Sequence, residues 1–322
     1  MEWILLGKNI LVLIPLKVEH KKLLEEKAPL ECFTYSTFET VDLAQVQEAN
    51  IIIGNPPIEM VKGSKKLNWL QLSSAGIGEY TKAKVLPDGV VLTNASGAYG
   101  LAISEYMLGV LLELYKNLHF YRDNQMESNW EYKGSVKSIY NSTVLVVGAG
   151  DIGSEFAKRV KALGAYTIGI RRKDSDKPSY LDELHFMDKI QELLPRADIV
   201  ALSLPGTSIT NRIINKETLQ LMKQDSVLIN VGRGTAIDTE ALCDALENGK
   251  LLGAALDVTD PEPLPKEHRL WKIKNAIITP HVSGGNSLQE TQERIIRISA
   301  DNLEAFIEGR RLQNVVDCLA GY

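Results

Sequence analysis

The chain has 322 residues, which is enough for about two domains with cores that need no disulfides. Its 36 Lys and Arg residues stand against 41 Asp and Glu residues, giving a formal net charge of −5 without a basic stripe, so we exclude a DNA- or RNA-binding protein. The three cysteines, Cys32, Cys243 and Cys318, are spaced neither as a disulfide framework nor as metal ligands, and they favour a reducing, cytoplasmic location without a bound metal.

In the first part of the chain, short apolar runs rich in β-forming residues alternate with amphipathic stretches. Such alternation favours a parallel sheet with helices on both faces. A long apolar helix is predicted from about 98 to 118, followed by a polar, aromatic passage, 121–140, that we interpret as a linker or lid. No apolar run approaches the ~20 residues of a membrane span, so we expect no membrane partner. The predicted strands are 10–14, 32–35, 51–53, 69–73 and 90–93, and the predicted helices between them are 19–27, 41–48 and 56–62.

The same alternation starts again at residue 143 and continues to residue 279. It predicts six strands with helices between most of them, as a doubly wound dinucleotide-binding fold requires. After Pro280 the chain forms one last helix, whose apolar positions can dock on the first domain. We therefore expect a continuous domain, 98–285, inserted into a first domain made of 1–97 and completed by the helix and tail of 286–322. The six strands are 143–147, 167–170, 199–204, 227–231, 254–258 and 276–279.

A glycine-rich turn stands at the first strand-to-helix junction of this second series. Residues 148–153 spell GxGxxG, with Asp151 and Ile152 before the last glycine. Gly148 allows a tight turn, Gly150 lets a pyrophosphate approach the backbone, and Gly153 lets helix and strand pack closely. Because the motif lies between a predicted strand and a predicted helix, it predicts a dinucleotide site rather than a simple turn.

The residues that should meet the adenosine ribose are basic. An NAD-binding site carries an acidic residue about 20 positions beyond the glycines, but here Arg171, Arg172 and Lys173 stand in that place. A guanidinium pairs with a 2′-phosphate, whereas a carboxylate repels it. The pattern favours NADP over NAD, with NAD still possible, because a run of charges is also common in a solvated turn.

Three later segments place polar residues at the carboxyl ends of successive predicted strands, where the crevice of an open α/β sheet lies. The segments 230–234, 257–263 and 279–284 contribute Arg233, Glu262 and His281. Hydride transfer to a 2-oxo acid needs a cation for the carboxylate, a proton donor for the new alkoxide, and a carboxylate that keeps this donor protonated. The arginine can supply the cation, the histidine the proton donor and the glutamate the carboxylate.

With these motifs in place, the chain resembles the D-isomer-specific 2-hydroxyacid dehydrogenases over essentially its whole length. The three segments are similar to that family's signatures around its catalytic Arg, Glu and His. The resemblance implies that Arg233 binds the substrate carboxylate and polarises the 2-oxo oxygen, and that His281 gives that oxygen its proton. It also implies that Glu262 hydrogen-bonds the imidazole and favours its charged form.

The resemblance carries further expectations about the fold and the site. It implies an α/β protein of two doubly wound parallel-sheet domains, a flavodoxin-like substrate domain and a Rossmann cofactor domain, that forms a homodimer through the long helix. Ala75 and Gly76 resemble the loop whose backbone amides meet the substrate carboxylate, and Asp257 matches the position that steadies the nicotinamide carboxamide. The other positions implied to bind cofactor are Leu204, Pro205, Val231, Gly232 and Gly284.

Basic residues at the ribose position resemble the NADPH-dependent glyoxylate and hydroxypyruvate reductases of the family. The leading hypothesis is therefore an NADPH-linked reductase of small 2-oxo acids. A phosphoglycerate dehydrogenase-type NAD enzyme is the alternative within the family, and a dinucleotide-sensing, corepressor-like interaction module is the alternative outside enzymes. Thr259, Gly206 and Ser208 depart from the family's frequent residues. None of them belongs to the predicted catalytic triad, so these departures concern the shape of the pocket rather than the chemistry.

Overall fold

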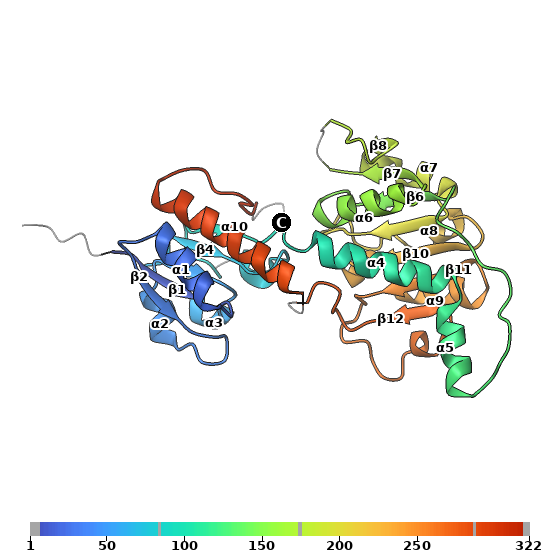
Figure 1. Ribbon diagram of the computed structural model, residues 1–322, viewed down its shortest axis with the longest axis horizontal. Coiled ribbons are helices and arrows are strands. Elements are labelled where there is room, and N and C mark those ends of the chain that lie inside the picture. Colours follow the sequence, from blue (N-terminus) through green and yellow to red (C-terminus); the bar gives the residue numbers. More distant parts are fainter. Residues whose placement is uncertain (1–6, 83–84, 173–175, 286–287, 318–322) are drawn as a thin grey trace, which may run out of the picture. The chain divides into compact units, whose positions relative to one another are not determined.

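The computed structural model describes residues 7–82, 85–172, 176–285 and 288–317 (Figure 1). The chain divides into two compact units: the first is Met1–Tyr99 with Asn286–Tyr322, and the second is Gly100–Gly285. The predicted boundary lay after residue 97. Tyr99 belongs to the first unit because its hydroxyl donates to the Ser73 carbonyl at 2.6 Å, whereas the Gly100 amide donates to Asp151 in the second unit at 3.0 Å.

The first unit is built on a five-stranded sheet of order β2-β1-β3-β4-β5, and every strand pair is parallel. This order is the flavodoxin-like one, so the expected fold of this unit is confirmed. The strands are β1 (Asn9–Val12), β2 (Cys32–Tyr35), β3 (Ile51–Ile53), β4 (Trp69–Gln71) and β5 (Val91–Thr93). The helices of the unit are α1 (Val18–Lys27), α2 (Leu43–Glu48), α3 (Ile58–Val61) and α10 (Gln289–Ile307).

The late helix α10 is held to the first unit by a buried polar network. Asn302 on α10 donates to the Gln71 Oε1 atom of β4 at 2.8 Å, and the Thr93 hydroxyl of β5 donates to the same oxygen at 2.7 Å. The Trp69 indole N–H donates to Thr93 at 2.8 Å, and its ring stacks on Phe306 with the centroids 5.2 Å apart. Since buried polar groups stabilise only when they are paired, this network fixes where α10 docks, beside α1 in Figure 1.

The second unit is built on a seven-stranded parallel sheet of order β12-β11-β10-β9-β6-β7-β8. The neighbours β6 and β9 mark the point where the strand order reverses, and ligands of such sheets bind outside the carboxyl ends of the strands there. The strands are β6 (Thr143–Val147), β7 (Tyr166–Ile170), β8 (Glu183–His185), β9 (Ile199–Leu202), β10 (Ser226–Asn230), β11 (Leu251–Leu256) and β12 (Ala276–Ile278). The prediction of six strands missed β8, which is a half-buried edge strand with the sequence ELH and no apolar run.

The long helix predicted over about 98–118 corresponds to α4 (Gly100–Tyr115), and a second helix, α5 (Leu118–Met126), follows it. Asn117 separates them with a φ of 57°, a left-handed conformation that ends α4. Helix α5 occupies the start of the passage that we interpreted as a linker or lid. The sequence does not indicate this helix, because its apolar residues do not follow one buried stripe. The remaining helices are α6 (Asp151–Ala162), α7 (Ile190–Leu193), α8 (Lys216–Leu221) and α9 (Thr239–Glu247). Within the described ranges, no helix is both long and apolar enough to span a bilayer.

Candidate active site

The glycine-rich turn joins β6 to α6, and each of its glycines has a distinct steric reason. A Cβ on Gly153 would lie 2.3 Å from the Gly148 carbonyl oxygen, and one on Gly148, where φ is 99°, would lie 2.8 Å from the Ser203 carbonyl oxygen. A Cβ on Gly150 would meet nothing within 4 Å. Gly148 and Gly153 therefore allow the turn to close, and Gly150 leaves open space at the amino end of α6. Backbone amides at the amino end of a helix, together with open space, suit a pyrophosphate, so the turn fits a dinucleotide.

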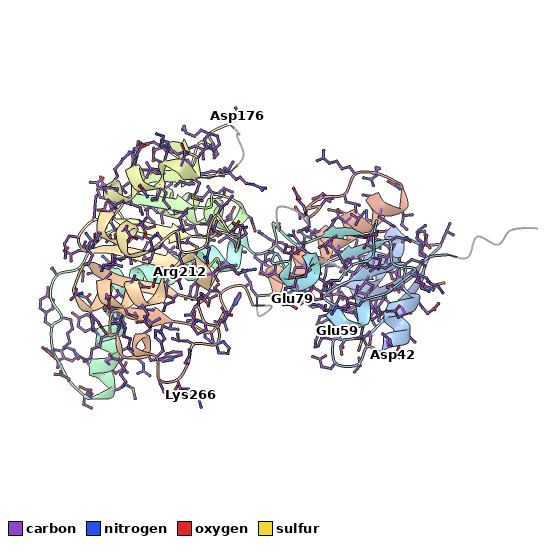
Figure 2. The ribbon with its side chains drawn as sticks, turned by 180° about the vertical axis from the view of Figure 1, so that it is seen from behind. Asp42, Glu59, Glu79, Asp176, Arg212 and Lys266 are labelled. Atoms are coloured by element: carbon purple, nitrogen blue, oxygen red, sulfur yellow. The ribbon has the colours of Figure 1, made fainter. Side chains whose placement is uncertain are left out.

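Arg171 lies over this turn at the carboxyl end of β7. Its Nε donates to the Ala149 carbonyl at 2.6 Å, and its Nη2 approaches the Ser154 hydroxyl at 3.3 Å and the Tyr180 hydroxyl at 3.4 Å. Arg172 is exposed, and Lys173 lies outside the described residues. In Figure 2, Asp176 lies at the outer edge of the second unit. A guanidinium held beside the glycine turn can pair with a phosphate near the ribose.

Arg233 follows β10 in a turn that two neighbouring loops shape. Asn230, whose side chain is buried, accepts a hydrogen bond from the Gly232 amide at 3.0 Å and donates to the Arg233 carbonyl at 2.9 Å. A Cβ on Gly232 would lie 2.5 Å from the Leu204 carbonyl oxygen, and one on Gly234 would lie 1.9 Å from the Thr259 carbonyl oxygen. Only glycine fits this close backbone approach, which brings the Arg233 turn beside the segments that follow β9 and β11.

These three segments enclose an open pocket of about 700 Å³. Its walls are mainly small, polar residues, together with the side chains of Arg233 and Glu262, so the pocket suits a small polar ligand. Gly206, Ser208 and Thr259, the positions at which the sequence departs from the family, all lie in this wall. The lining residues are Gly206, Thr207, Ser208, Asn211, Arg233, Gly234, Thr235, Thr259, Asp260 and Glu262.

His281 pairs with Glu262, with 2.7 Å between imidazole Nδ1 and carboxylate Oε1. Both side chains are about half exposed, at 49% and 43%, so they are accessible to a ligand. Because an ionised carboxylate only accepts hydrogen bonds, Nδ1 carries a proton, and Nε2 is the ring nitrogen that can exchange one with a substrate. His281 has a φ of 54°, and its amide donates to the Asp257 carbonyl at 2.8 Å.

Asp257 holds the turn that carries His281. Its carboxylate is buried and accepts hydrogen bonds from the Thr279 hydroxyl at 2.6 Å, the Val282 amide at 2.9 Å and the Ser283 amide at 3.0 Å, and also from the Ser283 hydroxyl. A carboxylate has about four acceptor sites, and four donors from one turn occupy them. We call residues 279–283 the histidine turn.

The structure brings most of the predicted site residues together in the second unit. Arg233, Glu262 and His281 surround or adjoin the pocket, Leu204 and Pro205 follow β9, and Val231 and Gly232 follow β10. Asp151 and Ile152 open α6, and Gly284 follows the histidine turn. Ala75 and Gly76 lie in the first unit after β4, where Asn94 donates to the Ala75 carbonyl at 3.0 Å.

Two features of the site were not singled out from the sequence. The first is the side chain of Asn230, which fixes the Arg233 turn. Asn230 lies in the predicted segment 230–234, but nothing in the sequence indicates the contacts of its side chain. The second is Tyr106 on α4, whose hydroxyl lies 2.7 Å from the Thr279 hydroxyl of the histidine turn. No motif surrounds Tyr106, so only the fold reveals this contact.

The chain is similar to proteins of one known family. The family model described as D-isomer specific 2-hydroxyacid dehydrogenase, NAD binding domain, matches residues 108–283. A glyoxylate reductase from Thermofilum pendens is 31% identical over 258 residues, which are 78% of this chain and 75% of that protein. A D-3-phosphoglycerate dehydrogenase from Methanocaldococcus jannaschii is 31% identical over 319 residues, 96% of this chain but only 59% of that protein. A crystal structure of a D-isomer specific 2-hydroxyacid dehydrogenase family protein from Aeromonas salmonicida aligns with a TM-score of 0.84 and 28% identity, covering 97% of this chain and 99% of the other.

Proposed function

Because the chain belongs to the D-isomer-specific 2-hydroxyacid dehydrogenase family, we propose that it transfers hydride between NADP(H) and a small 2-oxo or D-2-hydroxy acid such as glyoxylate or hydroxypyruvate. The observation that carries the proposal is the Glu262–His281 pair, 2.7 Å apart, at a pocket that Arg233 also lines. A cation, a proton donor and its acidic partner thus stand together at the carboxyl ends of the strands.

Each residue has a defined task in the proposed reaction. The Arg233 guanidinium binds the substrate carboxylate and polarises the 2-oxo oxygen, since a guanidinium matches a carboxylate with two parallel hydrogen bonds. When bound at the glycine turn, the nicotinamide cofactor supplies a hydride to C2 of the acid. His281 donates its Nε2 proton to the 2-oxo oxygen, and Glu262 stabilises the charged imidazole through Nδ1. The tasks expected for Ala75, Gly76 and Asp257 toward substrate and cofactor stay predictions.

A substrate panel tests the proposal. NADPH and NADH oxidation should be followed with glyoxylate, hydroxypyruvate, pyruvate, phenylpyruvate and phosphohydroxypyruvate. We expect the highest kcat/KM with glyoxylate or hydroxypyruvate. A preference for phosphohydroxypyruvate with NADH would favour the phosphoglycerate dehydrogenase alternative, which the Methanocaldococcus relative supports. Dinucleotide binding without turnover of any acid would favour a sensing, corepressor-like module instead.

The cofactor preference gives a separate prediction, supported by the position of Arg171 over the glycine turn. Replacing Arg171 by alanine should raise the KM for NADPH by roughly ten- to a hundredfold, the loss expected for a charged hydrogen bond, and should change the KM for NADH little. Arg122→Ala, which removes an exposed arginine of α5, is the matched control. A wild-type protein that prefers NADH would show that the basic residues form only a solvated turn.

We also propose a homodimer in the cytoplasm. The free thiols of Cys32 and Cys243 support the reducing location. The support for the dimer is the number of exposed apolar side chains along α5 and the segment after it, since exposed apolar surface often marks a protein–protein interface. Their exposed fractions are Leu118 51%, Met126 69%, Trp130 104%, Tyr132 77%, Val136 52% and Tyr140 67%.

Sedimentation tests the dimer directly. The wild-type protein should sediment at twice the chain mass of 35.7 kDa, and Trp130→Glu should shift it toward the monomer, because a carboxylate there would be buried without a partner. Trp271→Glu changes another exposed tryptophan of the same unit and should leave the mass unchanged. A wild-type monomer at micromolar concentration would contradict the proposal.

A further inference from the structure

Helix α4 contacts the histidine turn through the hydroxyl of Tyr106, 2.7 Å from the Thr279 hydroxyl. We infer that Tyr106 is a positioning residue that holds the histidine turn, and with it His281, in the geometry for proton transfer through the chain Tyr106–Thr279–Asp257. The inference rests on the proposed function, because it concerns the step in which His281 donates its proton. Three observations carry it: the direction of the hydrogen bonds, their burial, and the second attachment of α4.

The direction of the hydrogen bonds follows from counting protons. The Thr279 hydroxyl has one hydrogen, and it is donated to the Asp257 carboxylate at 2.6 Å, since an ionised carboxylate cannot donate. The contact of 2.7 Å between the Tyr106 and Thr279 hydroxyls therefore has Tyr106 as its donor. Each hydroxyl in such a chain polarises the next, so the Tyr106 proton strengthens the bond from Thr279 to Asp257.

Asp257 fixes the backbone of the histidine turn at His281 and at the two residues that follow it. Its carbonyl accepts the His281 amide at 2.8 Å, and its carboxylate accepts the amides of Val282 at 2.9 Å and Ser283 at 3.0 Å. His281 has a left-handed backbone conformation, which a non-glycine residue holds only when its surroundings enforce it. The hydrogen bonds from Tyr106 to Thr279 and from Thr279 to Asp257 help to hold His281 in this conformation.

The Tyr106 hydroxyl is suited to a permanent structural bond. Burial raises the pKa of Tyr106 to about 12, so the hydroxyl keeps its proton throughout the neutral range and remains a donor. A hydroxyl in this setting does not take part in the proton transfer itself. It acts by fixing the position of the histidine turn.

The same helix is also attached to the dinucleotide turn. The Gly100 amide, at the start of α4, donates to the Asp151 carboxylate at 3.0 Å, and Asp151 is the first residue of α6. A Cβ on Gly100 would lie 2.4 Å from the Asp151 Oδ1 atom, so the helix approaches as closely as glycine allows. Helix α4 therefore links the element that opens the dinucleotide site to the turn that carries the proton donor.

Replacing Tyr106 by phenylalanine tests this positioning role. We expect kcat to fall roughly three- to tenfold, the effect of one neutral hydrogen bond, with the KM values for acid and cofactor nearly unchanged, because neither Arg233 nor the glycine turn is altered. Amide hydrogen exchange of the peptide spanning 279–285 should accelerate in the same variant, measured without substrate. The control is Tyr115→Phe at the other end of α4, whose buried hydroxyl bonds to Ser142; it should change neither quantity.

Thr279 provides the second arm of the experiment. In a Thr279→Val background, Tyr106→Phe should have no further effect on kcat, because its acceptor is already gone, whereas Thr279→Ser should keep nearly full activity. Exchange rates and kcat that match the wild type in Tyr106→Phe would overturn the inference. A wild-type protein that reduces no 2-oxo acid would instead refute the proposed function, and the exchange measurement would still decide whether Tyr106 holds the turn.

Discussion

Replacing His281 by alanine is expected to lower kcat for 2-oxo acid reduction by about a hundred- to ten-thousandfold, the usual contribution of a positioned general acid. The imidazole is the group that supplies a proton to the developing alkoxide, and the neighbouring Glu262 carboxylate, 2.7 Å away, cannot take over while it is ionised. Steady-state kinetics with NADPH and glyoxylate measure the loss. Binding of NADPH, followed by fluorescence, should be retained because the glycine turn is unchanged.

The matched control for this variant is His268→Ala. His268 also pairs with a glutamate in the second unit, with 3.2 Å between its Nε2 and Glu240 Oε1, but Glu240 does not line the pocket, whereas Glu262 does. We expect the loss of His268 to affect stability more than turnover. Equal effects of the two substitutions on kcat would mean that His281 is only another structural histidine, and the proposed mechanism would have to be abandoned.

The second large effect is expected at Gly153. An alanine there would place its Cβ 2.3 Å from the Gly148 carbonyl oxygen and 2.8 Å from Val146 Cγ1, so the turn must move. Overpacking of this kind costs about 1 to 3 kcal/mol. We expect a lower Tm in differential scanning calorimetry together with a loss of NADPH binding, since the displaced turn no longer presents the helix amides to the pyrophosphate.

Gly150→Ala separates the two parts of this expectation. The added methyl group would meet no atom of the protein within 4 Å, and φ of Gly150 is −84°, so the Tm should stay close to that of the wild type. The methyl group would, however, occupy the space in which the pyrophosphate approaches the backbone, and NADPH binding should weaken. If Gly153→Ala were as stable as Gly150→Ala, the steric account of the turn would be wrong.

The sequence pattern predicts both sheets of this protein because most of their central strands are buried on both faces. The runs at 51–53 and 143–147 are continuous and apolar, which is typical of parallel strands covered by helices. Strand β8 was missed because an edge strand buries little, and Glu183–Leu184–His185 has no apolar run. Helix α5 was missed for a related reason: most of its residues are exposed, so no buried stripe marks it.

A site residue could be predicted where the few residues around it in the sequence form a recognisable motif. Arg233, Glu262 and His281 each stand in such a segment, but a histidine beside a glutamate is not rare in this fold. His20 lies 3.1 Å from Glu293 and His185 lies 2.7 Å from Glu183, and neither contact belongs to the pocket. Only the sequence context around His281 separated it from these. The contact of Tyr106 with Thr279 joins positions 173 residues apart, and no local pattern encodes it.

The docking of α10 has a consequence for biosynthesis. Strands β1 to β5 are synthesised before α10, so the first unit lacks two of its contacts while residues 100–285 are being made. Trp69 then has no stacking partner Phe306, and Gln71 has no hydrogen bond from Asn302. Residues 100–285 meanwhile contain every strand of their own sheet and can fold during translation. The second unit can therefore fold before the first unit is complete, because the first unit needs α10, which follows the whole second unit in the sequence.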